Sequence, residues 1–212
     1  MVSTGVAGRP FDAVLCDLDN VVRFYDMSRV AELERELGLA EGTAAGVAYA
    51  PERDLPLLLG RVSYEEWTDA VERGLGEWVS DGRRARELAV AFAEAPSWVD
   101  QVVVELLWRV RGRARVVLVT NATVRLEKEL AALGLADLAH EVVSSAREGV
   151  AKPDRRIYRL AAERAGVPEE RCLFVDDRLE NVEAAVACGM RGVHYRQAED
   201  LRGALAGMWE GR

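Results

Sequence analysis

Residues 13–19 read Ala-Val-Leu-Cys-Asp-Leu-Asp, and residues 172–177 read Cys-Leu-Phe-Val-Asp-Asp. Each stretch is a short apolar run that ends in aspartates, and such a run is typical of a buried strand. The carboxylates therefore stand at strand ends, where an open parallel sheet forms its crevice. Carboxylates held close together repel one another and favour a cation between them. The two stretches predict a metal site built around a nucleophilic aspartate.

Other β-rich runs show the same organisation, because helical patterns separate them along the chain. Strand, helix and strand at short intervals predict a parallel sheet with right-handed crossovers. The expected class is α/β, with a Rossmann-like parallel sheet core, helices on both faces and an inserted helical cap. The expected strands are residues 13–16, 115–120, 141–143, 172–175 and 192–195, and the helices between the last four are 124–133, 157–165 and 182–187.

The interval from residue 22 to residue 113 carries no β signal, although a crossover needs only about a dozen residues. The excess predicts an inserted helical module. We expect a core domain of residues 1–22 and 96–212 and a helical cap domain of residues 23–95. The expected helices of the interval are residues 29–37, 64–75, 83–94 and 98–110, and residues 40–48 are expected to form a mobile loop.

Composition limits the classes of protein and partner. The chain has 212 residues, half of them apolar, and a net charge of −8. No basic block stands out, so nucleic acid is not an expected partner. No apolar run reaches the ~20 residues that span a bilayer, and residues 1–10 contain no apolar signal core. We therefore expect a cytoplasmic protein that has no membrane partner.

The three cysteines, Cys16, Cys172 and Cys188, lack metal-type spacing. They predict small buried thiols in a reducing compartment. A redox role for Cys16, which precedes Asp17, is the lesser alternative.

Asp17 and Asp19 follow the first expected strand at positions i and i+2, so both side chains can approach one site. A carboxylate at Asp17 can attack a phosphoryl group or a carbon electrophile. Asp19 can then protonate the leaving group and later activate water. The alternative is a polar turn that ends a strand, and this short pattern alone does not decide between them.

Thr120 and Asn121 end the second expected strand and offer a hydroxyl and an amide to phosphate oxygens. The alternative is an ordinary helix N-cap by Asn121 or Thr123, which is compatible with anion binding at the same helix end.

Lys152 is one of two lysines in an arginine-rich chain. Its ammonium can offset carboxylate repulsion and hold both a nucleophile and a phosphate. The alternative, a solvated lysine at a helix start, is disfavoured by the helix dipole.

Asp176 and Asp177 end the fourth expected strand, and Asn181 follows shortly after. Oxygen ligands without cysteine fit Mg²⁺, whereas the alternative is a pair of surface acids on a loop. The order of the motifs is more specific than any one of them. All four follow successive strands of one parallel sheet, so they share its carboxyl edge, where ligands bind in open α/β folds.

In this order the motifs resemble the haloacid dehalogenase superfamily over nearly the whole chain. The resemblance rests on residues 17–22, 118–121, 151–154 and 174–190. Residues 20–22, the cap segment 60–67 and residues 156–158 look most like one branch, which contains bacterial α-D-glucose-1-phosphate phosphatases and the N-terminal phosphatase domains of epoxide hydrolases. That branch carries a small helical cap after the first strand.

The resemblance implies a role for each catalytic and substrate-binding residue. Asp17 is implied to be the nucleophile, which forms an aspartyl-phosphate, and Asp19 the general acid and base. Thr120 and Asn121 are implied to bind the phosphoryl group, and Lys152 to bridge Asp17 and phosphate.

For the metal, the resemblance implies Mg²⁺ with Asp17, the backbone carbonyl of Asp19 and Asp177 as ligands. Asp176 is implied to act through water. One departure concerns Asn20, because many relatives have glycine at that position.

The expected function is Mg²⁺-dependent hydrolysis of a small-metabolite phosphomonoester, with a sugar phosphate as a candidate substrate. A phosphosugar mutase is the main alternative, in which cap arginines such as Arg23, Arg53 or Arg61 would bind a second phosphate. A 2-haloacid dehalogenase and a non-catalytic binding module are lesser alternatives, and the aspartate at position 19 argues against the dehalogenase. The expected partner is a phosphorylated small molecule, and a homodimer is left open.

Overall fold

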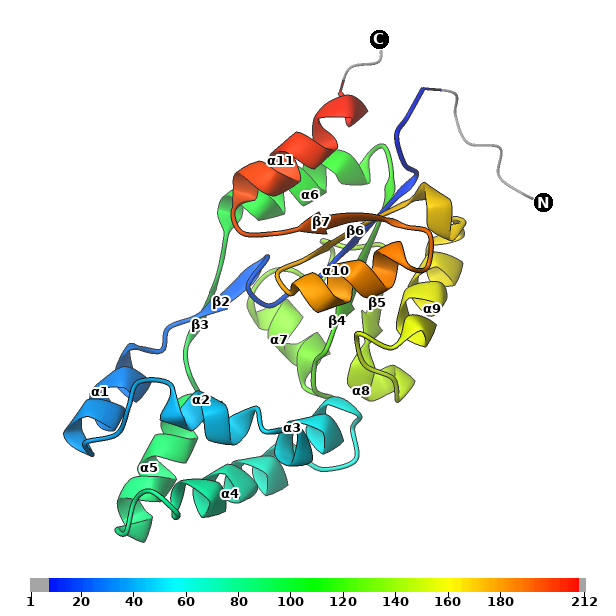
Figure 1. Cartoon of the computed structure of the whole chain (residues 1–212). Coiled ribbons are helices and arrows are strands. Elements are labelled where there is room, and N and C mark those ends of the chain that lie inside the picture. Colours follow the sequence, from blue (N-terminus) through cyan, green and yellow to red (C-terminus); the bar gives the residue numbers. More distant parts are fainter. Residues whose placement is uncertain (1–7, 210–212) are drawn as a thin grey trace. The chain divides into compact units, whose positions relative to one another are not determined.

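The computed structural model describes residues 8–209 (Figure 1). Residues 1–7, within the stretch that shows no apolar signal core, lie outside the described residues. The chain divides into two compact units. The core unit comprises Met1–Phe24 and Val99–Arg212, and the helical unit comprises Tyr25–Trp98. Within residues 8–209, no helix is both long and apolar enough to cross a membrane.

A five-stranded sheet with the order β5-β4-β1-β6-β7 forms the centre of the core unit, and its neighbouring strands are all parallel. Strands β1 and β6 are buried along their whole length, as expected for a parallel sheet covered on both faces. The α/β prediction is confirmed, and the strands match their expected bounds to within one residue. The strands are β1 (Ala13–Cys16), β4 (Arg115–Thr120), β5 (Glu141–Ser144), β6 (Cys172–Asp176) and β7 (Arg191–His194).

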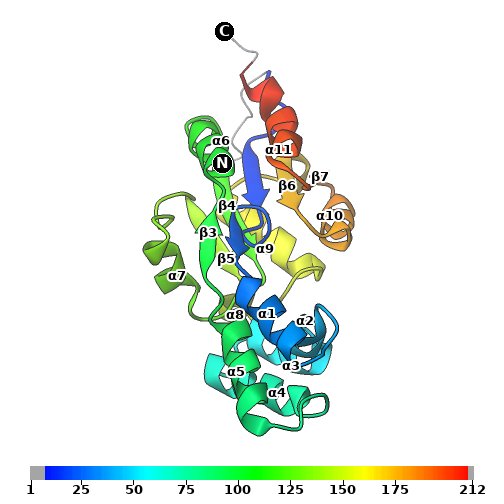
Figure 2. The same ribbon diagram turned by 90° about the vertical axis from the view of Figure 1, so that its left-hand side faces the viewer.

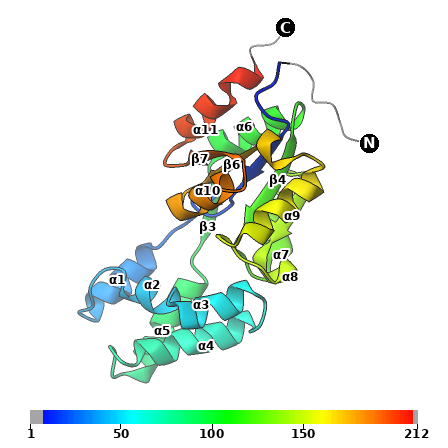
Figure 3. The same cartoon turned by 45° about the vertical axis from the view of Figure 1, so that its right-hand side comes forward.

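Helices cover both faces of this sheet (Figure 2). Successive strand residues point to opposite faces, so Val14 and Leu15 enter different apolar clusters. On the first face pack α6 (Gln101–Arg111), α7 (Leu126–Ala132) and α11 (Ala198–Leu205), with α6 and α11 side by side (Figure 3). On the second pack α9 (Arg155–Ala165) and α10 (Leu179–Val186). Short pieces complete the unit: α8 (Ser145–Glu148), η1 (Glu169–Arg171) and η2 (Ala206–Met208).

The helical unit has an apolar core of its own, in which Trp67 and Phe92 are the largest buried side chains. Helix α4 begins at the capping box formed by Ser63 and Glu66. The helices are α1 (Ser28–Glu36), α2 (Thr43–Ala48), α3 (Pro51–Leu58), α4 (Tyr64–Leu75) and α5 (Gly82–Ala93).

Residues 40–48 correct one sequence prediction, because they contain helix α2 and not a loop without secondary structure. The buried Glu34 carboxylate accepts hydrogen bonds from the backbone N–H groups of Gly42 and Ala44, at 3.0 and 2.7 Å. It thereby satisfies N–H groups at the start of α2, and the alanines that follow favour a helix. The cap comes from α1, eight to ten residues earlier in the chain, so the composition of residues 40–48 did not reveal it.

The chain enters and leaves the helical unit through two paired strands, β2 (Arg23–Tyr25) and β3 (Ser97–Val99). The predicted helix start at residue 98 is therefore wrong. Helix α6 begins at Gln101, after Asp100, whose carboxylate accepts hydrogen bonds from the N–H groups of Val102 and Val103. Strand pairing between distant residues, and not local propensity, sets this boundary.

Candidate active site

Three carboxylates meet at the carboxyl edge of the sheet. Asp17 follows β1, Asp176 is the last residue of β6, and Asp177 comes next. Because β1 and β6 are adjacent and parallel, their carboxyl ends lie together. One oxygen from each of the three carboxylates lies within 4.8 Å of the others. This acidic cluster has the donor type and spacing for a hard divalent cation.

Lys152 is buried against this acidic cluster. Its Nζ lies 2.7 Å from Asp17 Oδ1 and 2.7 Å from Asp176 Oδ2, and its side chain is only 1% exposed. The alternative of a solvated lysine is therefore wrong. Three acids face one ammonium, so ionised carboxylates leave an excess of negative charge. A divalent cation would offset that excess.

Asn121 fixes the backbone that carries this lysine. Its Oδ1 accepts a hydrogen bond from Lys152 N at 2.8 Å, and its Nδ2 donates to Lys152 O at 3.0 Å. The N-cap alternative for Asn121 is wrong, because α7 begins only at Leu126. Thr123 accepts from Arg125 N at 3.2 Å and stabilises the turn before that helix. An amide carries two N–H donors, so Asn121 retains one for another acceptor.

Thr120 ends β4 and is 1% exposed. Its Oγ1 has no hydrogen-bond partner within residues 8–209. Leaving a buried hydroxyl without a hydrogen-bond partner costs roughly 1–3 kcal/mol of folding free energy. The unsatisfied hydroxyl of Thr120 therefore favours a ligand at this position. A phosphoryl oxygen at the strand end would accept its hydrogen bond.

The two acids after β6 differ in their surroundings. Asp176 is fully buried, and its Oδ1 accepts hydrogen bonds from Asn181 Nδ2 and Arg178 N, both at 2.9 Å. Its Oδ2 contacts Lys152. Asp177 is only half-buried, and its Oδ2 accepts a hydrogen bond from Asn20 Nδ2 at 3.1 Å. Asp176 is thus committed to protein groups on both oxygens, whereas Asp177 faces a more open environment.

The carboxylate of Asp19 lies outside this cluster of three acids. It forms a two-pronged ion pair with the guanidinium of Arg23, at 2.6 Å from Nε to Oδ1 and 3.1 Å from Nη2 to Oδ2. Sequence reasoning named Arg23 only as a cap arginine for a second phosphate. The structure places it in the core unit, paired with Asp19.

Burial raises the pKa of Asp17 to about 7; Lys152 opposes this rise and Asp176 adds to it. Burial and then the Asp176 charge also raise the pKa of Asp177. For Lys152, burial acts to lower the pKa, but Asp17 and Asp176 outweigh it and the pKa is raised. The lysine therefore stays charged, and the groups whose ionisation burial opposes are the carboxyl groups.

The sequence gives little indication that two further residues, Asn20 and Tyr158, lie beside the site. Asn20 has a φ of 59°, in the left-handed region, and its only sequence signal was that it replaces a glycine of relatives. Tyr158 packs edge-on against Phe174, and its buried hydroxyl has no partner in the described part of the chain. An aromatic residue on a helix gives no signal of such a position before the fold is known.

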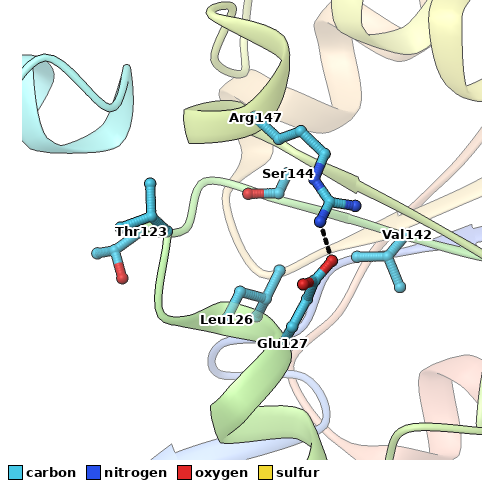
Figure 4. A pocket seen from close by; sticks show the side chains of 7 residues that line it. Thr123, Leu126, Glu127, Val142, Ser144 and Arg147 are labelled. Carbon is cyan, nitrogen blue, oxygen red and sulfur yellow. Dashed lines mark hydrogen bonds and ion pairs between the residues drawn. The ribbon is translucent and has the colours of Figure 1, made fainter.

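A pocket of about 270 Å³ lies at the ends of β4 and β5, and it is separate from the acidic cluster. The ion pair between Arg147 and Glu127 crosses it (Figure 4). Its lining residues are Thr123, Val124, Leu126, Glu127, Val142, Ser144 and Arg147. None of them has a role in the expected chemistry.

The parallel sheet, the acidic cluster and the buried lysine define an α/β protein whose charged groups gather at the carboxyl edge of its sheet. The chain belongs to the haloacid dehalogenase-like hydrolase family, whose model matches residues 11–189.

Curated relatives include a pyrimidine 5′-nucleotidase of Escherichia coli, which is 35% identical over 146 residues, or 65% of this chain and 62% of the relative. A phosphatase of Mycobacterium tuberculosis is 43% identical over 84 residues, or 39% of each chain. The matches thus span less than two thirds of either relative.

Among solved structures, a family member from Bacteroides thetaiotaomicron in complex with magnesium and inorganic phosphate has a TM-score of 0.67. The similarity covers 88% of this chain and 94% of that one, at 19% identity. At this identity the similarity supports the fold.

Proposed function

We propose that the protein is a Mg²⁺-dependent phosphatase that hydrolyses the phosphomonoester of a small metabolite through an aspartyl-phosphate. The observation that carries the proposal is the position of Lys152, buried between Asp17 and Asp176 at the edge of the acidic cluster. The family membership supports it, and so do the names of the two relatives, one a phosphatase and the other a pyrimidine 5′-nucleotidase.

The residues present fit Mg²⁺, because the cluster offers only oxygen donors and carries excess negative charge. Asp17, Asp177 and the backbone carbonyl of Asp19 would hold the ion. Asp176 would act through water, since both its oxygens already accept hydrogen bonds. When bound, Mg²⁺ supplies positive charge that offsets the acids and the phosphoryl oxygens.

In the first step, a carboxylate oxygen of Asp17 attacks phosphorus and the bond to the leaving oxygen breaks. The leaving oxygen takes the proton of Asp19, so the alcohol departs neutral. Lys152 stabilises the negative charge on the phosphoryl oxygens, while Thr120 donates the hydrogen bond for which its hydroxyl has no protein partner. The remaining N–H of Asn121 is a further donor.

In the second step, the Asp19 carboxylate removes a proton from water as the water oxygen attacks phosphorus. The bond between phosphorus and the Asp17 oxygen breaks. Inorganic phosphate leaves, Asp17 is regenerated, and Asp19 holds the proton needed for the next cycle. The two steps together consume one water and one phosphomonoester.

The test is phosphate release by the purified protein from a panel of nucleotides, sugar phosphates and a nitrophenyl phosphate, with and without Mg²⁺. We expect Mg²⁺-dependent release, and a loss of more than about 10³-fold in Asp17→Asn, because that variant lacks the nucleophile. Asp12→Asn is the matched control, since Asp12 pairs with Arg171 before β1 starts.

Two results would overturn the proposal. One is a wild-type protein that binds Mg²⁺ but releases no phosphate from any substrate of the panel. The other is undiminished release by Asp17→Asn. A sugar phosphate that is isomerised without release of phosphate would instead favour the mutase.

A further inference from the structure

The two proposed steps give no role to Arg23, which lies at the centre of a cluster of charged side chains in the core unit. Arg23 is 3% exposed and binds two carboxylates at once. Its Nε and Nη2 contact the two oxygens of Asp19, and its Nη1 donates to Glu129 Oε2 at 2.8 Å. Arg125 contacts the other oxygen of Glu129, at 3.5 Å.

The loop after β1 holds Arg23 and Asp19 in a fixed relation. Arg23 N donates to Leu18 O at 2.8 Å, and Asn20 N donates to Arg23 O at 2.7 Å. Glu129 belongs to α7, so its ion pair ties this loop to a helix packed on the sheet. The guanidinium of Arg23 therefore connects the loop that carries Asp17 and Asp19 to helix α7.

We propose that Arg23 is a positioning residue that fixes the Asp19 carboxylate for proton transfer, and that Glu129 holds Arg23 in place. This inference rests on the proposed phosphatase function. A guanidinium fork fixes both the position and the plane of a carboxylate, which a single contact does not. Each Asp19 oxygen keeps a second lone pair for a proton, so the fork is compatible with acid and base chemistry.

The same geometry argues against Arg23 as a binding group for a second phosphate. All three of its guanidinium nitrogens contact carboxylates, and the side chain is almost inaccessible to solvent. Because so little of its side chain is exposed, Arg23 would have to leave its present position to bind a phosphate. A purely structural role remains the competing account, and substrates with different leaving groups separate the two.

The experiment compares kcat/KM for a nitrophenyl phosphate and for an alkyl phosphate, both with Mg²⁺. An alkoxide leaving group needs a proton from Asp19, whereas nitrophenolate is stable without one. In Arg23→Gln we expect a fall of about 10²-fold for the alkyl substrate and of less than about tenfold for the aryl substrate. Arg23→Lys should not restore the alkyl rate, because an ammonium cannot form the fork.

Two further variants complete the design. Glu129→Gln should shift the ratio of the two rates in the same direction by a smaller factor, and it carries the test if Arg23→Gln does not fold. Arg171→Gln is the control, because Arg171 also binds an aspartate in the core unit, Asp12, away from the acidic cluster. It should leave the ratio of the two rates unchanged.

A double-mutant cycle tests whether Arg23 acts through Asp19. Adding Arg23→Gln to Asp19→Asn should cost little more on the alkyl substrate, since the group to be positioned is gone. The inference would be overturned if Arg23→Gln lowers kcat/KM equally for both substrates, or if the losses in the cycle are additive. Either result would leave the proposed phosphatase function standing. A wild type inactive on both substrates would overturn the proposed function and this inference with it.

Discussion

Lys152 is buried with its Nζ 2.7 Å from an oxygen of Asp17 and of Asp176. Removing one partner of a buried ion pair leaves uncompensated charge. Lys152→Met should therefore destabilise the metal-free protein by about 3 kcal/mol or more at about pH 8. The loss should shrink at about pH 5, because Asp17, whose pKa is raised to about 7, is then protonated and needs no counter-charge. Urea unfolding at the two pH values measures it.

Lys128→Met is the matched control, because this second lysine of the chain is exposed on α7. Its effect should stay within about 0.5 kcal/mol, as for other surface substitutions. If Lys152→Met lowers the free energy of unfolding equally at both pH values, buried carboxylates without a counter-charge are not the cause of the destabilisation.

The raised pKa of Asp17, about 7, makes both stability and metal binding depend on pH. The folded pKa exceeds the usual 3.8, so the stability that this group contributes is fully present below that value and is lost as pH rises through about 7. Mg²⁺ needs the ionised form and competes with the proton.

Calorimetric Mg²⁺ affinity should thus rise with pH up to about 7, by at most about tenfold per unit for this proton, and then level off. In Asp17→Asn the rise should flatten, although binding is weaker. An affinity that does not change between about pH 5.5 and pH 7 would count against the metal site.

The loop between β1 and β2 carries its own strain at Asn20, whose φ is 59°. The side chain donates to Asp177, one of the acids of the cluster. Asn20→Gly should keep the stability of the fold, because glycine adopts positive φ freely, while Mg²⁺ affinity falls about tenfold through loss of the Asp177 partner. Calorimetry and urea unfolding measure the two effects.

Asn20→Ala separates the causes at the same position. It loses the amide as Asn20→Gly does, but it also places a Cβ at positive φ, which costs about 1 kcal/mol or more. Equal Mg²⁺ affinities in the two variants, with lower stability only for alanine, would support this reading. Wild-type affinity in both would show that Asn20 does not orient Asp177.

Elements whose signal is local could be predicted from the sequence, and elements set by distant contacts could not. The strands that carry the motifs are continuous apolar runs, and the Ser63 capping box marks the start of α4. Helix α2 depends on Glu34, eight or more residues earlier, and β3 depends on pairing with β2. Neither contact leaves a local pattern in the sequence.

The candidate site divides in the same way. Asp17, Asp176 and Lys152 could be brought together from the sequence, because polar residues that follow parallel strands share one edge. The pairing of Arg23 with Asp19 could not, because an arginine-rich chain offers many equivalent arginines. The partner of Arg23 on α7, Glu129, lies 106 residues further along the chain.

At the scale of the whole molecule, each unit has an apolar core of its own. The chain passes between them at β2 and β3, and directly beside these strands Asp26 N donates to Pro96 O at 2.7 Å. We therefore expect that residues 26–97 can be replaced by a short Gly-Ser linker without loss of core folding. Urea unfolding of this variant should be cooperative, with a smaller slope than the full chain because less surface is exposed. A non-cooperative transition would contradict two independent units.

The proposed mechanism requires that Asp17 carries the phosphoryl group during turnover. The most direct measurement is mass spectrometry of the Asp17 peptide after acid quenching of Asp19→Asn with Mg²⁺ and a nitrophenyl phosphate. Nitrophenolate leaves in the first step without needing a proton, whereas loss of the base slows the second step. We therefore expect a phosphorylated Asp17 peptide. The mechanism would be contradicted if the wild type releases phosphate but Asp17 carries no phosphoryl group. That absence would have to be found both in the variant and in wild-type protein quenched during turnover.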